Sequence, residues 1–384
     1  MFWSGFWLAP TPMHVLVTTD TISGVWSYTR ELVSGLVSRG LQVTLVSFGE
    51  VPLPEQTSWM ESLHGLDYRP TAFRLEWMQD SEHDYSDSCA YLRALVEEIE
   101  PDVVHLNQFC HGNLDLPVPR VVVAHGDLIT WWLAVHDREP KSAPWLERYR
   151  NVVRKGLAGA TVVVAPSQWM LETLRQTYDA PQVGRVIYNG RNPIFFNPYV
   201  NKQDSVIAVG RMLDAGKQVH LLTHHQHPLP VCIVGSETGA VTPRLPIRAD
   251  VKVDVADLSV SLKGPQTESQ LRMLYSRATM YAATSRYEAF GMAPLEAALS
   301  RCAIVANDIP SFREIWGDDA IYFSTNDATG LASAIRELAR DRDLCRAYAN
   351  RAYQRARDRY NHKRMIDEYL QLYRTLPTLS RAAA

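Results

Sequence analysis

The sequence predicts an α/β fold of two domains, each built on a doubly wound parallel sheet. The chain of 384 residues exceeds the length at which a single core stops growing, so two domains are expected. Short apolar strands alternate with helical segments twice, once before and once after a turn-rich break at residues 189–193. Two such Rossmann-like domains facing each other leave a cleft lined by loops at the carboxyl ends of strands.

The expected elements follow the order strand, helix, strand in both halves. The first half is expected to contain strands over 14–18, 42–47, 103–106, 120–124, 161–165 and 186–188, with helices over 26–38, 91–99 and 169–177. The second half is expected to contain strands over 206–209, 231–234, 260–262, 280–283 and 303–307, with helices over 219–223, 267–277, 328–340 and 344–360 and one beginning near Pro294. We therefore expect one domain at 1–195 and a second at 196–361.

The composition is that of an ordinary globular protein, with 46% hydrophobic and 21% charged residues. A net charge of −3 gives no reason to expect nucleic acid as a partner. The five cysteines are scattered without zinc-ligand spacing, which favours reduced thiols in a cytoplasmic protein. Residues 1–12 are aromatic but lack a signal-peptide pattern. We expect them to form a flexible extension, the alternative being a peripheral contact with the inner face of a membrane.

The most informative stretch is 285–298, in which Glu288 and Glu296 flank a Phe-Gly turn. Pro294 suits the first turn of a helix, so Glu288 is expected in the preceding loop and Glu296 on the helix. The free N–H groups at such a helix start favour a phosphate, and a carboxylate there can accept hydrogen bonds from sugar hydroxyls. This combination suggests a nucleotide-sugar site.

Two further loops follow the first strand of each half. Gly24 would let the backbone approach a ligand closely, the alternative being a plain tight turn. Gly210 precedes Arg211 and Lys217, a planar cation and a point charge suited to a diphosphate, the alternative being a solvated basic loop. The Gly24 loop lacks the three-glycine dinucleotide fingerprint, which argues against an NAD enzyme. The Gly210 loop does not have the spacing of a Walker A loop.

Other candidates are a histidine at a strand end and a group of tryptophans. His125 follows an apolar strand, where doubly wound domains place functional groups, the alternative being a buried structural histidine. Trp26, Trp131 and Trp132 are candidates for stacking on an acceptor, although core packing explains most tryptophans. The histidines of 224–227 have no carboxylate or cysteine at ligand spacing, so we expect a solvated loop and no metal.

Together these features resemble the retaining nucleotide-sugar glycosyltransferases of family 4. The resemblance extends from Met13 to about Tyr373. It rests on several short motifs: Ser23-Gly24-Val25-Trp26-Ser27-Tyr28, Asp102-Val103-Val104-His105, Ala165-Pro166-Ser167, Tyr188-Asn189-Gly190, Val209-Gly210-Arg211 with Lys217, and the segment from Glu288 to Glu296. It implies a GT-B fold, whose last helix, here within 362–384, crosses back to the N-terminal domain.

The resemblance also implies roles for the matching residues. Glu288 would contact the donor sugar near the reacting centre, and Glu296 the ribose hydroxyls. Arg211 and Lys217 would hold the diphosphate. His125 would contact the donor sugar from the opposite domain.

The remaining donor-site positions would act mainly through the backbone. The amides of Phe290, Gly291 and Met292 would bind sugar and phosphate oxygens. Gly24 and Gly210 would lie close to the phosphates. Two positions depart from the commonest family pattern, namely Ser23 in place of a glycine and Met292 in place of Leu or Val, and neither removes a polar group.

The expected activity is transfer of a hexose from a UDP- or GDP-sugar to a saccharide, lipid or small-molecule acceptor. The resemblance implies that the anomeric configuration is retained and that neither a metal nor another cofactor is needed. The alternatives are a nucleotide-sugar epimerase on the same fold, or a non-catalytic protein that binds nucleotide sugars. The sequence leaves the base, the sugar and the acceptor open.

Overall fold

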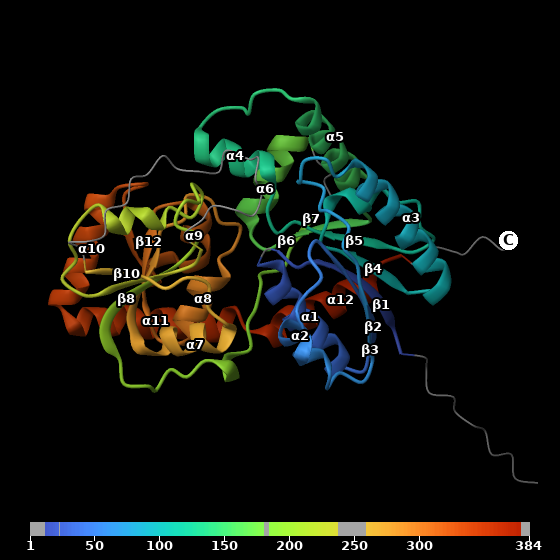
Figure 1. Cartoon of the computed structure of the whole chain (residues 1–384). Coiled ribbons are helices and arrows are strands. Elements are labelled where there is room, and N and C mark those ends of the chain that lie inside the picture. Colours follow the sequence, from blue (N-terminus) through green and yellow to red (C-terminus); the bar gives the residue numbers. More distant parts are fainter. Residues whose placement is uncertain (1–11, 23, 180–183, 237–258, 378–384) are drawn as a thin grey trace, which may run out of the picture.

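The computed structural model describes residues 12–22, 24–179, 184–236 and 259–377 (Figure 1). The expected extension at 1–12 lies almost wholly outside these residues, as does Ser23 of the first loop. The described part folds around two separate parallel sheets. The predicted fold class, two doubly wound α/β units, is thereby confirmed.

The N-terminal sheet has seven strands in the order β3-β2-β1-β4-β5-β6-β7. Its strands are β1 His14–Asp20, β2 Gln42–Phe48, β3 Leu66–Pro70, β4 Val103–Leu106, β5 Arg120–Val123, β6 Val162–Ala165 and β7 Gly184–Val186. Its helices are α1 Val25–Ser38, α2 Pro54–Thr57, α3 Glu82–Ile99, α4 Leu128–His136, α5 Pro144–Gly159 and α6 Gln168–Tyr178, with 3₁₀ turns η1 Ser58–Met60, η2 Phe109–Asn113 and η3 Pro193–Phe195. The sequence analysis had not resolved β3, α4 and α5.

The C-terminal sheet has six strands in the order β10-β9-β8-β11-β12-β13. Its strands are β8 Gln203–Val209, β9 Val231–Val234, β10 Val260–Leu262, β11 Ala278–Ala283, β12 Ala303–Asn307 and β13 Ile321–Phe323. Its helices are α7 Glu268–Arg277, α8 Met292–Leu299, α9 Pro310–Trp316, α10 Ala328–Arg340 and α11 Arg342–Arg359, with 3₁₀ turns η4 Val219–Thr223 and η5 Gly317–Asp319. The expected helix over 219–223 is therefore a 3₁₀ turn.

Side chains alternate between the two faces of each sheet and fill a separate core on each face. In the N-terminal sheet, Val15 and Val17 of β1 face α1, whereas Leu16 faces the core beneath α3 and α5. The C-terminal sheet is covered by α8, α9 and α11 on one face and by α10 on the other. Burial on both faces explains why these strands are continuous apolar runs.

The last helix, α12 His362–Thr375, packs on the N-terminal half although α11 before it belongs to the C-terminal half (Figure 1). Met365, Ile366 and Tyr369 share a core with α1. The approach is close, because a Cβ added to Gly35 of α1 would lie 1.9 Å from Ile366. The boundaries 1–195, 196–361 and 362–384 remain predictions.

Within the described residues, the model contains no helix with both the length and the apolar character needed to cross a membrane. All five cysteines are free, and four of them are buried.

Candidate active site

A cavity of about 660 Å³ lies between the two halves at the carboxyl ends of both sheets. Its N-terminal wall comes mainly from the loops that follow β1, β3, β4 and β5, and its C-terminal wall mainly from those that follow β8 and β11. Tyr287 joins the walls, because its hydroxyl accepts from the amide of Asp127 at 3.1 Å. This is the place where open α/β sheets bind ligands.

The loop after β8 presents two cations to the cavity. Arg211 and Lys217 line it, and each side chain is 37% exposed. Asp214 organises the loop: its Oδ2 accepts from Arg211 at 2.6 Å and its Oδ1 from the amides of Gly216 and Lys217. Gly210 is closely packed there, because an added Cβ would lie 3.0 Å from Cβ of Lys217. The loop thus holds two positive charges at the cavity wall.

The loop after β11 and the start of α8 complete the C-terminal wall. Gly291 caps α8 at a φ of +94°, and an added Cβ would lie 2.8 Å from Pro294. Only glycine adopts this conformation readily. Phe290, Gly291 and Met292 all line the cavity, so the start of α8 is open to it. Its first N–H groups and dipole favour an anion there.

Glu288 is paired with Lys217, with their Oε2 and Nζ atoms 2.6 Å apart. The hydroxyl of Ser285 donates to the same oxygen at 3.1 Å. Burial alone would lower the pKa of Lys217, but the Glu288 carboxylate outweighs it and raises that pKa. Lys217 is therefore a cation at neutral pH.

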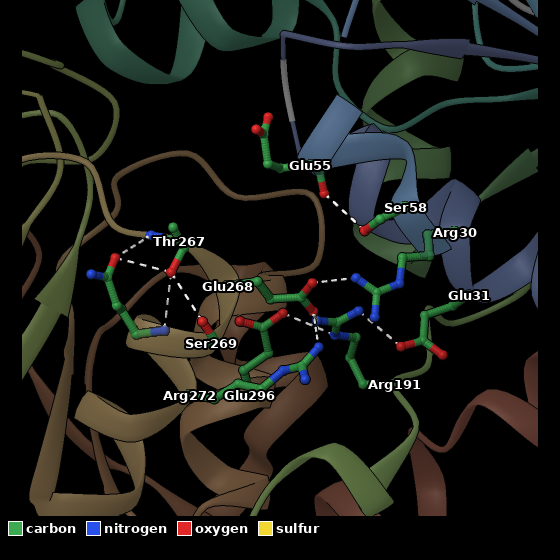
Figure 2. A network of polar contacts seen from close by, with 11 residues as sticks. Arg30, Glu31, Glu55, Ser58, Arg191, Thr267, Glu268, Ser269, Arg272 and Glu296 are labelled. Atoms are coloured by element: carbon green, nitrogen blue, oxygen red, sulfur yellow. Dashed lines mark hydrogen bonds and ion pairs between the residues drawn. The ribbon is translucent and has the colours of Figure 1, made fainter. Parts of the chain in front are cut away.

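Glu296 lines the cavity and is held by an arginine that the sequence analysis had treated as part of a turn-rich break. Arg191 is 1% exposed, and its guanidinium forms ion pairs with Glu31, Glu268 and Glu296 at 2.8, 2.7 and 2.9 Å (Figure 2). These carboxylates come from α1, α7 and α8. Figure 2 shows Arg30 and Arg272 converging on Glu268 as well. The cluster links the N-terminal half to the carboxylate expected to bind ribose.

His125 lines the cavity on the N-terminal wall, two residues beyond β5. Its Nε2 lies 2.7 Å from Oδ1 of Asn107, and Nδ2 of Asn107 donates to the carbonyl of Thr18 at 2.6 Å. Since that carbonyl only accepts, Asn107 must present its oxygen to His125, and Nε2 must carry the proton. Burial lowers the pKa of His125 to about 3. The ring is therefore neutral, with Nδ1 left as an acceptor.

Only some of the remaining candidates from the sequence line the cavity. Gly24 and Trp131 line the cavity. Trp26 and Trp132 are not among the described residues that do so: Trp26 packs edge-on against Trp59, and the Trp132 ring lies 4.2 Å from that of His136. Their acceptor contacts remain predictions.

Many lining residues were not candidates from the sequence, and Glu76, Trp77 and Gln108 are three of them. Glu76 and Trp77 come from the loop after β3, and Gln108 from the loop after β4. A carboxylate next to a tryptophan in a loop carries no recognisable spacing. Gln108 and Phe109 after Asn107 are equally typical of the edge of an apolar core, so they do not indicate a ligand site.

Metal-binding residues do not cluster anywhere in the described chain, where no three His, Cys, Asp or Glu side chains could share an ion. The histidines of the 224–227 segment are accordingly separate. His227 is buried with Nε2 2.9 Å from the Leu222 carbonyl oxygen, and His225 contacts Thr329.

A cation pair, a helix start and two carboxylates surround one cavity between the halves, an arrangement suited to a nucleotide-sugar donor. Two family models match, "Glycosyltransferase Family 4" over residues 22–194 and "Glycosyl transferases group 1" over 198–355. The chain belongs to the family 4 glycosyltransferases. It is a glycosyltransferase of the GT-B fold, as the sequence analysis predicted.

Individual relatives agree with this assignment. The chain is 27% identical to an alpha-maltose-1-phosphate synthase of Mycobacterium tuberculosis over an alignment of 290 residues, which covers 67% of this chain and 73% of the relative. Among solved structures, sucrose-phosphate synthase from Thermosynechococcus elongatus has a TM-score of 0.74 at 18% identity, covering 95% of this chain and 99% of its own. HepE of Anabaena in complex with UDP and glucose has a TM-score of 0.70 at 16% identity, covering 95% and 100%. These two likenesses concern the fold.

Proposed function

We propose that this retaining glycosyltransferase moves a hexose from a UDP- or GDP-sugar to a hydroxyl of a saccharide, lipid or small molecule. The observation that carries the proposal is the pair Arg211 and Lys217, each about a third exposed, beside the open start of α8. A diphosphate placed there would meet two cations and a helix dipole. Such preorganised charge is the largest single contribution in many transferases.

Each donor-site residue receives a role from its surroundings. Arg211 and Lys217 hold the diphosphate, and the amides of Phe290, Gly291 and Met292 bind its oxygens and those of the sugar. Glu296 accepts from ribose hydroxyls with the oxygens that its pairing with Arg191 leaves accessible.

Glu288 and His125 act on the transferred sugar from opposite walls. The carboxylate of Glu288 stabilises positive charge that develops on the ring. His125 is neutral and carries its proton on Nε2, so Nδ1 accepts a hydrogen bond from a sugar hydroxyl. The ring does not act as a general acid. Gly24 lets the backbone approach the phosphates.

The reaction needs no side-chain base. The bond between the anomeric carbon and the leaving phosphate oxygen breaks with its electron pair going to the diphosphate. The acceptor oxygen then bonds to the anomeric carbon on the same face. Its proton passes to the departing phosphate oxygen, which Arg211 and Lys217 stabilise. We place this reaction in the cytoplasm, where nucleotide sugars are made.

The experiment is donor turnover by the full chain. The protein is incubated with UDP- and GDP-hexoses, and release of the nucleoside diphosphate and the free sugar is followed. We expect slow hydrolysis of at least one donor, with the free sugar released first as the retained anomer. A donor that is converted to an isomeric nucleotide sugar would favour the epimerase alternative, and binding without any turnover would favour a non-catalytic binding protein.

A further inference from the structure

Among the described residues, the lysine and arginine side chains that line the cavity all lie on one wall, which also carries Asp214, Glu288 and Glu296. The cations Arg211 and Lys217 lie on the C-terminal wall. On the N-terminal wall, the described lining residues include the carboxylates Asp20, Glu76 and Asp127 and no lysine or arginine. His125 on that wall is neutral. A donor diphosphate suits the first wall, and a second phosphate would find no counter-charge on the other.

Glu76 lines the cavity and has acceptor positions left for a ligand. Its Oε1 accepts from the amide of Phe109 at 3.0 Å. A carboxylate has about four acceptor positions, so a hydroxyl can still be bound. Asp127 differs, because Tyr149, Tyr178 and the amide of Thr130 already donate to it at 2.7 to 2.8 Å. The hydrogen bonds of Asp127 therefore hold the wall together, whereas Glu76 has acceptor positions left for a ligand.

Gln108 is an independent sign that a polar ligand belongs here. It is 3% exposed and lines the cavity beside Phe109. Neither Nε2 nor Oε1 of its amide has a hydrogen-bond partner. A buried amide without partners is costly, and a ligand that both donates and accepts would satisfy it. Hydroxyl groups of a sugar do both.

Trp77 provides the apolar complement on the same wall. Aromatic faces stack on the C–H surfaces of sugar rings, while carboxylates and amides bind their hydroxyls. A phosphorylated acceptor would instead bring a dianion to a wall whose described lining residues include no lysine or arginine, so the desolvation of the phosphate would not be compensated.

Resting on the proposed function, we infer that the acceptor is an uncharged, polyhydroxylated sugar whose hydroxyls form hydrogen bonds with Glu76 and Gln108. Sugar phosphates are rejected at this subsite. The N-terminal wall thus favours an uncharged acceptor, because its described lining residues include no lysine or arginine and because Glu76 and Gln108 offer hydrogen bonds to hydroxyls.

The test separates donor chemistry from acceptor choice. Hydrolysis of the donor without acceptor is measured first, and its absence with every nucleotide sugar contradicts the proposed function itself. A hydrolysing enzyme is then given a panel of uncharged mono- and disaccharides and the same sugars carrying one phosphate. We expect a kcat/KM at least about 100-fold higher for an uncharged acceptor than for its phosphate. A phosphorylated acceptor that is used equally well or better overturns the inference, as does a panel in which no uncharged sugar accepts.

Variants locate the effect on the wall. Glu76→Gln and Gln108→Ala should raise the acceptor KM about tenfold or more, with a much smaller change in the donor KM. Glu76→Lys should raise the use of sugar phosphates relative to uncharged sugars. Glu97→Gln, on the exposed face of α3, is the matched control and should behave as wild type. If donor and acceptor KM change equally, or Glu76→Lys leaves the preference unchanged, these residues do not read the acceptor.

Discussion

Replacing Arg191 by methionine should destabilise the protein by about 3–5 kcal/mol. The guanidinium is 1% exposed and forms three ion pairs, and the side chains of Glu31 and Glu296 are only 6% and 10% exposed. Removing one partner of a buried pair leaves uncompensated buried charge, which costs about that much. Methionine keeps most of the volume, so the loss reports charge and not a cavity.

The pH dependence of this loss distinguishes charge from packing. Burial alone would raise the pKa of Glu268, but the cations, Arg191 first among them, lower it to about 2. A lowered pKa stabilises the fold above the unfolded value near 4.5, and the stabilisation is lost as the pH falls towards 2. Burial already raises the pKa of Glu296, and without the opposing Arg191 guanidinium that pKa would rise further. The difference between wild type and variant should therefore shrink below about pH 4.5.

The assay is urea unfolding at pH 7 and pH 4, followed by tryptophan fluorescence and circular dichroism. Arg346→Met is the matched control, because Arg346 is 74% exposed and pairs with the exposed Asp343. An exposed pair contributes about 0–1 kcal/mol. A loss below about 1 kcal/mol for Arg191→Met, or a loss that is the same at both pH values, would refute the argument from buried charge.

Three further outcomes are expected. Glu288→Gln should lower kcat more than it raises the donor KM, whereas Glu296→Gln should mainly raise the donor KM; near-wild-type kinetics in both would remove them from the donor site. Turnover should persist in EDTA, because Arg211 and Lys217 already neutralise the phosphates; a complete loss restored by Mg²⁺ or Mn²⁺ would contradict this. Burial, with the Asp20 and Asp127 carboxylates adding to it, raises the pKa of Glu76 to about 7. The folded state then binds this proton more tightly, so stability falls as the pH rises from about 4.5 to 7, and Glu76→Gln should gain about 2–3 kcal/mol relative to wild type between pH 4.5 and 8 in urea unfolding. An equal pH dependence in the two proteins would show that Glu76 has an ordinary pKa.

The sequence predicted the fold well because its signals are local. Apolar strands such as 15–17 and 121–123, buried on both faces, are continuous runs that need no knowledge of their neighbours. The loops at 210–217 and 288–296 were also recognisable, since glycines and charges stand at fixed offsets within each segment.

What the sequence could not supply depends on distant segments meeting. Arg191 looked like part of a solvated turn, because its partners Glu31, Glu268 and Glu296 lie 160, 77 and 105 positions away. Asn107 fixes the tautomer of His125 only through the carbonyl of another strand. The same limit applies to Trp26, because its contact with Trp59 of the 3₁₀ turn η1 cannot be recognised from the sequence.

Loss of the positive charge of Lys217 tests the central claim most directly. The claim is that Arg211 and Lys217 stabilise the departing diphosphate. At saturating donor, Lys217→Ala should remove about 2–4 kcal/mol of transition-state stabilisation, as for one preorganised donor, and so lower kcat about 30- to 10³-fold. Lys155→Ala, on the exposed face of α5, is the control. An unchanged kcat for Lys217→Ala, with its donor saturated and its fold intact, would contradict the account.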